Sequence, residues 1–161
     1  MKKVLSLLLL CMLTFSTARS QILSVGPMLH CYFPGGKPKI TAGFEVAAYF
    51  LAPLSNIGLP SIDLGIEGGR DVTFVYSEFQ LATIMREGIT LYRNSSSVLG
   101  GSIGPFIKFE KEKPSEIGLQ LTVWDCFIVG ADLRLRAAPK YLDLGAGTFA
   151  KLPIPLLNMH F

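Results

Sequence analysis

The chain has 161 residues, of which 50% are hydrophobic and 17% are charged, with 15 basic and 12 acidic side chains. Soluble domains carry about 25% charged residues, so this chain is apolar, yet no stretch after the first twenty residues reaches the roughly 18 apolar residues of a membrane helix. The whole basic excess lies within the first twenty residues, so nothing in the rest of the chain suggests a nucleic-acid partner, which would need a clustered basic surface.

Residues 1–20 predict a cleaved secretory signal peptide. Lys2 and Lys3 precede an uncharged apolar run, and the small pair Ala18 and Ser20 predicts cleavage before Gln21. The run has about 12 residues, too few to cross a bilayer of about 30 Å as a helix. Removing 1–20 removes three basic residues and no acid, so 12 of each remain and the net charge is zero. We therefore expect one exported domain at 21–161.

Eight segments of the exported domain alternate apolar and polar residues or have a β-rich composition. Turn-like sequence separates most of them. Each segment is about as long as a tilted membrane strand, which needs about 9–11 residues. In chain order they are 22–33, 38–51, 60–69, 72–83, 97–109, 116–124, 127–137 and 142–152. The pattern predicts an all-β fold, an eight-stranded antiparallel up-and-down β-barrel of the transmembrane type.

The alternation is clearest in four of these segments. Their apolar faces are Phe44, Val46, Ala48 and Phe50; Ile62, Leu64 and Ile66; Ile117, Leu119, Leu121 and Val123; and Phe127, Val129, Ala131, Leu133 and Leu135. The opposite faces hold mainly polar and small residues. In the fourth segment, the large apolar Ile128 also falls on this opposite face. A soluble barrel hides its apolar face, whereas a membrane barrel shows that face to lipid. Because glycines mixed with a few charges suit the narrow interior of eight strands, we expect the polar faces to point inward.

Charged residues on the polar faces predict an ion-pair network inside the barrel. Charges removed from water must be paired and hydrogen-bonded, and arginine binds carboxylates through a two-pronged donor. The network is expected to contain Glu45, Asp63, Glu67, Glu78, Lys108, Asp132, Arg134 and Arg136. The alternative is a set of solvated charges on a soluble sheet.

The strand ends carry further signals. Aromatic girdles mark the two interfaces of membrane barrels, and aromatic residues lie near the predicted strand ends: Phe33, Phe50, Phe74, Phe109, Trp124, Phe127 and Tyr141. The terminal Phe161, with Leu157 and Met159 at alternate positions, resembles the signal read by the outer-membrane assembly machinery. However, Pro153 and Pro155 lack ladder donors, so we expect the last strand to end near Leu152.

Two other features leave alternatives open. The connection 84–96 is longer than the short periplasmic turns of such barrels, so ITLY at 89–92 could form another strand. Cys31 and Cys126 survive cleavage and could form a disulfide. The strand order places them at opposite ends of the barrel, which favours two small buried side chains instead.

Taken together, SVGPMLHCYF, GFEVAAYF, FVYSEFQLAT, GGSIGPFIKFE, IGLQLTVWDCFIVGADLRLR and GTFAKLPIP resemble small outer-membrane β-barrel proteins of Bacteroidota-type bacteria. The resemblance covers roughly residues 22–155. It implies an eight-stranded fold in the outer membrane of a Gram-negative bacterium. These proteins have no known catalytic residues that could be assigned to positions of this chain.

The sequence offers little chemistry. No metal-ligand cluster, cofactor motif or phosphate loop is present, and eight strands leave no water-filled lumen. His30 is expected to point inward, hydrogen-bonded to a carboxylate. A lipid-modifying enzyme that uses His30 as a base is one alternative. Ser24 shares the face of His30 but lies about 20 Å away along the strand, so Ser102 or Glu67 would be its neighbour if the strand register brings them together.

We therefore expect a monomeric outer-membrane barrel with a structural or surface-interaction role. Its partners would be outer-membrane lipid and, during biogenesis, the assembly machinery, with no nucleic acid. The connections 34–38, 68–71, 111–116 and 137–140 would face outward. A soluble periplasmic barrel with its apolar face inward around an apolar ligand is the other alternative.

Overall fold

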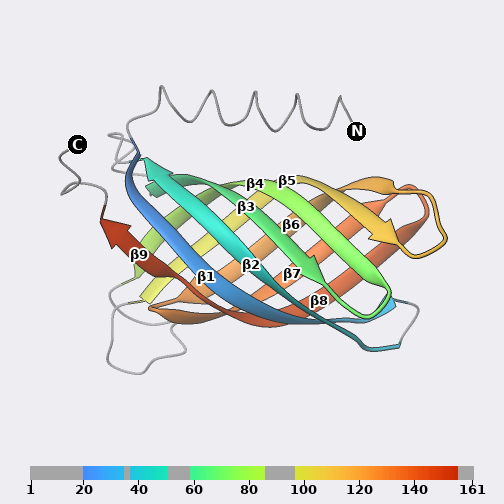
Figure 1. The fold of residues 1–161 in the computed structure, drawn as a ribbon. Coiled ribbons are helices and arrows are strands. Elements are labelled where there is room, and N and C mark those ends of the chain that lie inside the picture. Colours follow the sequence, from blue (N-terminus) through green and yellow to red (C-terminus); the bar gives the residue numbers. More distant parts are fainter. Residues whose placement is uncertain (1–19, 35–36, 51–58, 86–96, 156–161) are drawn as a thin grey trace.

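The computed structural model describes residues 20–34, 37–50, 59–85 and 97–155. These residues form the strands β1 Ser20–Tyr32, β2 Lys39–Phe50, β3 Leu59–Gly68, β4 Val72–Met85, β5 Ser97–Glu110, β6 Glu116–Cys126, β7 Val129–Ala138, β8 Tyr141–Ala150 and β9 Leu152–Pro155. Consecutive strands from β1 to β8 pair antiparallel, and β1 also pairs with β8, so the sheet closes on itself (Figure 1). The predicted closed eight-stranded up-and-down barrel is confirmed.

Strands β8 and β9 act as one strand with a break in its ladder. Met28 opposes Phe149 in β8, and Val25 opposes Leu152 in β9, which is the same register against β1. The ladder is interrupted beside Pro27, which has no N–H to donate. The eighth strand therefore continues past the break to the end of β9.

The prediction that the last strand ends near Leu152 is wrong. Pro153 and Pro155 both lie in β9 and pair with β1. In the part of the chain that the structure describes, β9 is paired with β1 alone. The two prolines are two residues apart, so their nitrogens share one side of the strand, and on an edge strand that side can be the unpaired one.

The two ends of the barrel differ. At the turn end, the connections 33–38, 69–71, 111–115 and 139–140 join successive strands; at the terminal end, β1 begins and β9 ends (Figure 1). The four predicted outward connections all lie at the turn end. Ser20, the last residue of the predicted signal, is the first residue of β1.

Some sequence predictions fall outside the described residues. They are the signal segment 1–19, ITLY at 89–92, and the tail 156–161 with Phe161. Within the described ranges, no helix is long and apolar enough to cross a membrane.

Along each strand, side chains alternate between the barrel interior and its outer surface, as the pleat requires. The interior side chains include many polar and charged groups, whereas the exposed ones include most large aliphatic residues of the strands. The face assignments made for 43–47, 62–67 and 117–124 are confirmed. Ala48 departs from the prediction, since the alternation places it outward but it is 4% exposed. Ile128 also departs from it, since it lies in the two-residue connection between β6 and β7 and is 47% exposed.

Interior glycines make room for aromatic rings of the residues paired with them on the neighbouring strand. A β-carbon at Gly65 would stand 2.1 Å from Tyr76 Cζ, and one at Gly145 would stand 2.3 Å from Tyr32 Cδ1. Only the absence of a side chain lets each ring cross the narrow interior at these points. This explains why glycine shares the inward face with the charged residues.

The aromatic residues near strand ends divide between the two faces. Phe33, Phe109 and Phe127 are exposed, as a girdle requires, but Phe74 and Trp124 are 3% and 4% exposed. Phe74 and Trp124 occupy inward positions of β4 and β6, so the prediction that they belong to a girdle is wrong.

Candidate functional site

The barrel interior is where buried charged side chains gather. Seven of the eight predicted network members have exposed fractions of 9% or less: Glu45, Asp63, Glu67, Glu78, Asp132, Arg134 and Arg136. The eighth, Lys108, lies near the turn end, where its Nζ is 3.0 Å from a Glu110 oxygen and 3.8 Å from a Glu116 oxygen. The structure thus joins Lys108 to ion pairs at the rim instead of to the central network.

Glu67 on β3 is the centre of the network. Its Oε1 accepts hydrogen bonds from the Tyr32 hydroxyl at 2.8 Å and from the Arg136 guanidinium, and its Oε2 accepts from Thr41 Oγ1 at 2.8 Å. Arg136 also donates to Gln120 Oε1. These bonds connect β1, β2, β3, β6 and β7 across the barrel, so one carboxylate links most of its circumference.

His30 on β1 lies between two carboxylates. Its Nδ1 is 3.0 Å from Glu67 Oε2, and its Nε2 is 2.9 Å from Asp132 Oδ2. The expected bond from His30 to a carboxylate is therefore present twice. Because each ring nitrogen faces a carboxylate oxygen, neither is left to activate a hydroxyl group.

These two contacts also constrain where a proton lies. A neutral imidazole has one donor and one acceptor nitrogen, and an ionised carboxylate only accepts. Both contacts can be hydrogen bonds only if one proton is added to the set of a neutral His30 ring and ionised Glu67 and Asp132 carboxylates.

The guanidinium of Arg136 is enclosed by aromatic rings. Its Cζ lies 3.9 Å from the Phe74 ring centroid, 4.4 Å from that of Tyr32 and 5.7 Å from that of Phe106. Arg136 and Phe106 are both 0% exposed. Cation–π contacts of this kind gain strength when water is excluded. Together these side chains fill the barrel below its turn end.

Lys151 is a network member that the sequence analysis missed. It lies in the break between β8 and β9, and its Nζ is 3.1 Å from Glu45 Oε1 and 3.0 Å from Asp63 Oδ2. The alternation in 142–152 could have revealed this member, because Lys151 is two residues after Phe149 and four after Gly147 and therefore lies on the same inward face. Its amide donates to Ile128 O at 2.8 Å, which holds the backbone in place at the break.

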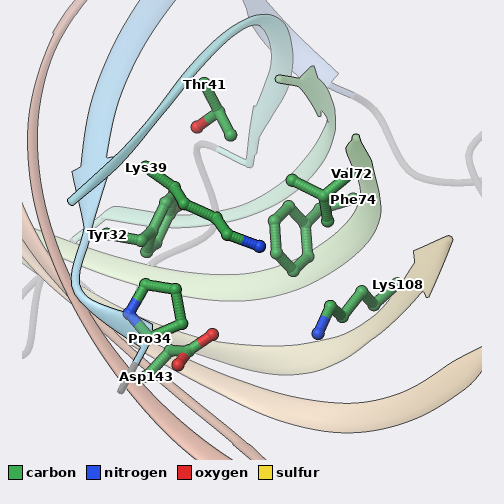
Figure 2. Close-up of a pocket in the computed structure, with 8 residues that line it drawn as sticks. All are labelled: Tyr32, Pro34, Lys39, Thr41, Val72, Phe74, Lys108 and Asp143. Carbon is green, nitrogen blue, oxygen red and sulfur yellow. The ribbon is translucent and has the colours of Figure 1, made fainter. Parts of the chain in front are cut away.

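A small pocket opens at the turn end, above the rings around Arg136. It contains about 280 Å³ of space, part of it open to solvent, and Lys39, Lys108 and Asp143 project into it (Figure 2). Tyr32 and Phe74 form part of its wall. Only about 20 Å³ of this space can be occupied by the centre of a water-sized sphere, so the pocket has room for about one water or a small ion and not for an organic ligand.

The interior does not match the soluble alternative. That alternative places the apolar faces inward around an apolar ligand, but the described interior carries the polar faces and is filled by a hydrogen-bonded network. The inward-apolar arrangement is therefore wrong for this chain.

No family model matches the chain, and neither the curated proteins nor the solved structures include a match.

Proposed function

We propose that this protein is a small outer-membrane β-barrel of a Gram-negative bacterium, with a structural or surface-interaction role and no catalysis. After removal of its signal peptide, the chain would be inserted by the outer-membrane assembly machinery and would be surrounded by lipid as a monomer.

The observation that carries this proposal is the inverted polarity of the barrel. Ile40, Ile117 and Leu142 on the outer surface are 66–67% exposed, while Asp63 and Arg136 inside are 0% exposed. Soluble monomers rarely expose a contiguous apolar patch larger than a few hundred Å². In a bilayer, the same belt needs no protein partner, because lipid tails cover it.

The length of the strands agrees with a bilayer. β6 has 11 residues, which at about 3.4 Å per residue and a tilt of about 40° cover roughly 26 Å along the barrel axis. Outer-membrane barrels have an apolar band about 25 Å tall.

The filled interior supports a structural role over transport or catalysis. Arg136 and its aromatic rings occupy the cross-section below the turn end, which argues against a water-filled channel. Both nitrogens of His30 are bound to carboxylates, which argues against His30 as a catalytic base. Among the described residues, the surfaces that could serve such a role are the connections at the turn end and the exposed apolar belt.

The proposal is tested first by gel mobility and then by lipid quenching. The purified protein is run in SDS with and without boiling, since a closed membrane barrel stays compact until it is heated. The folded protein is then placed in vesicles of brominated phosphatidylcholine, and fluorescence is compared between the native protein and Val123→Trp. The native chain has one tryptophan, Trp124, which points inward and is 4% exposed, while Val123 points outward and is 52% exposed.

The expected result is a mobility shift on boiling, weak quenching of Trp124 and strong quenching of the indole added at position 123. A protein that stays soluble without detergent, shows no shift and is not quenched at either position would overturn the proposal.

A further inference from the structure

A small cavity lies inside the barrel, apart from the pocket at the turn end. Its walls include Ser102 on β5, Thr122 and Trp124 on β6, and Asp132 and Arg134 on β7. All five residues have exposed fractions of 4% or less. About 10 Å³ of the cavity can be occupied by the centre of a water-sized sphere, which is close to the least that one water needs. The cavity therefore has room for one molecule of that size.

Four buried polar atoms of these walls have no hydrogen-bond partner among the described residues. They are Ser102 Oγ, Trp124 Nε1, Asp132 Oδ1 and Arg134 Nη1. Arg134 Nη1 is 3.7 Å from Glu67 Oε1, which is too far for a hydrogen bond. Because buried polar atoms are nearly always bonded to protein or to ordered water, four such atoms from the walls of one cavity indicate a bound molecule.

The register of the sheet places the four residues side by side. Ser102 opposes Thr122 in the β5–β6 ladder, and Thr122 opposes Arg134 in the β6–β7 ladder. The next pair on the same inward face of β6 and β7 is Trp124 and Asp132. The four atoms thus belong to one patch of neighbouring positions, where a single small molecule can contact several of them.

The four atoms also define the chemistry of that molecule. Trp124 Nε1 and Arg134 Nη1 can only donate hydrogen bonds, the ionised Asp132 can only accept them, and Ser102 Oγ can do either. The two N–H donors disfavour a metal cation, and the Asp132 carboxylate disfavours an anion such as chloride. Water is neutral and small, and it accepts two hydrogen bonds and donates two, so it can satisfy all four atoms.

We propose that this cavity binds one ordered water molecule, which accepts hydrogen bonds from Trp124 and Arg134 and donates to Asp132 and Ser102. The water would join β5, β6 and β7 inside the barrel. It would also complete the partners of Asp132, whose other carboxylate oxygen contacts His30 and Arg134. This inference goes beyond the proposed function and does not require a membrane around the barrel.

The test uses the only tryptophan of the chain as its probe. In the folded protein labelled with a heavy nitrogen isotope, Trp124 gives a single indole N–H resonance. Rotating-frame NMR spectra then record magnetisation transfer between the indole proton and water. Direct transfer from a bound water and chemical exchange of the indole proton give signals of opposite sign, so the two processes are distinguished. The dispersion of the backbone amide resonances shows whether each variant has folded.

Three variants identify the source of the signal. Ser102→Val fills the cavity with methyl groups, whereas Ser102→Ala removes the hydroxyl group and leaves the space. Ser77→Val is the matched control, because it makes the same change at a position of β4 between the inward Tyr76 and Glu78, which therefore faces outward.

We expect direct transfer from water to the indole proton in the native protein, in Ser102→Ala and in Ser77→Val. The transfer should be lost in Ser102→Val. If Ser102→Val does not fold, Thr122→Val takes its place, and there the transfer should persist because the cavity is not filled from Ser102.

An exchange signal alone, or no signal, in the native protein would overturn the inference. Loss of the transfer in Ser102→Ala would assign it to the hydroxyl group of Ser102 and would also overturn the inference. The same holds if the transfer persists in folded Ser102→Val or is lost in Thr122→Val, because another hydroxyl group would then be its source.

Discussion

Gly147 lies directly across the β1–β8 ladder from His30, and a β-carbon at Gly147 would stand 1.9 Å from His30 Cδ2. The ring of His30 can therefore occupy its place between Glu67 and Asp132 only because position 147 has no side chain. The centre of the charged network depends on an uncharged residue.

Gly147→Ala should destabilise the barrel by about 1–3 kcal/mol, because overpacking forces the His30 ring or the backbone to move. Gly101→Ala is the matched control, since the atom nearest to a β-carbon at position 101 would be Thr122 O, at an ordinary contact distance of 3.7 Å. Urea titration of the heat-modifiable gel band measures both. Equal stability of the two variants would contradict the packing of His30 against Gly147.

Arg136→Met should cost about 3–5 kcal/mol, because the buried carboxylate of Glu67 loses its hydrogen-bonded guanidinium and keeps only the more distant Arg134, at 3.7 Å, as an arginine partner. Adding Glu67→Gln to this variant should recover part of the loss, since an amide can lie buried without a compensating cation. The double-mutant cycle is measured by urea unfolding. If the second substitution made the protein less stable still, the loss would come from the aromatic contacts of Arg136 and not from Glu67.

Lys151→Met should also destabilise the barrel, because Glu45 and Asp63 both lose their closest ammonium group. Lys140→Met, at an exposed position in a turn, should change stability by less than about 0.5 kcal/mol. The fraction of folded protein after refolding into detergent, read on unboiled gels, compares the two. A similar yield for both variants would show that Lys151 is not needed to balance the interior carboxylates.

Cys31 and Cys126 should both be free thiols in the native protein. Cys31 opposes Ile40 near the turn end, and Cys126 opposes Gly130 at the terminal end, and both are unbonded. The chain has a third cysteine, Cys11, within the predicted signal peptide. Alkylation of the chain without this signal, in denaturant and without a reducing agent, followed by mass measurement, should add two labels per chain. A single chain that accepts no label until it is reduced would contradict this arrangement.

The alternation of residues predicted the faces of the barrel well. In β6 and β7, it placed Gln120, Thr122, Arg134 and Arg136 inward before any pairing was known, because the two faces of a strand are set by position alone. It misplaced Ile128 because the hairpin between these strands is only two residues long, which periodicity does not reveal.

The contacts within the network could not be predicted in the same way. His30 and Asp132 are 102 residues apart, and whether they meet depends on how far successive strands are staggered around the barrel. Lys108 illustrates the difference: its inward face was predicted, but its height near the rim pairs it with Glu110 instead of with the interior carboxylates.

The pairing of β1 with β8 and β9 has a consequence for how the chain folds. Every other ladder joins neighbouring strands and can form by local zipping, but this one joins segments more than a hundred residues apart, such as Met28 and Phe149. Ordering so long an intervening chain costs entropy before the ladder can repay it. Closure is therefore expected to be the slow, final step, and until it occurs the chain is an open sheet with two unsatisfied edges.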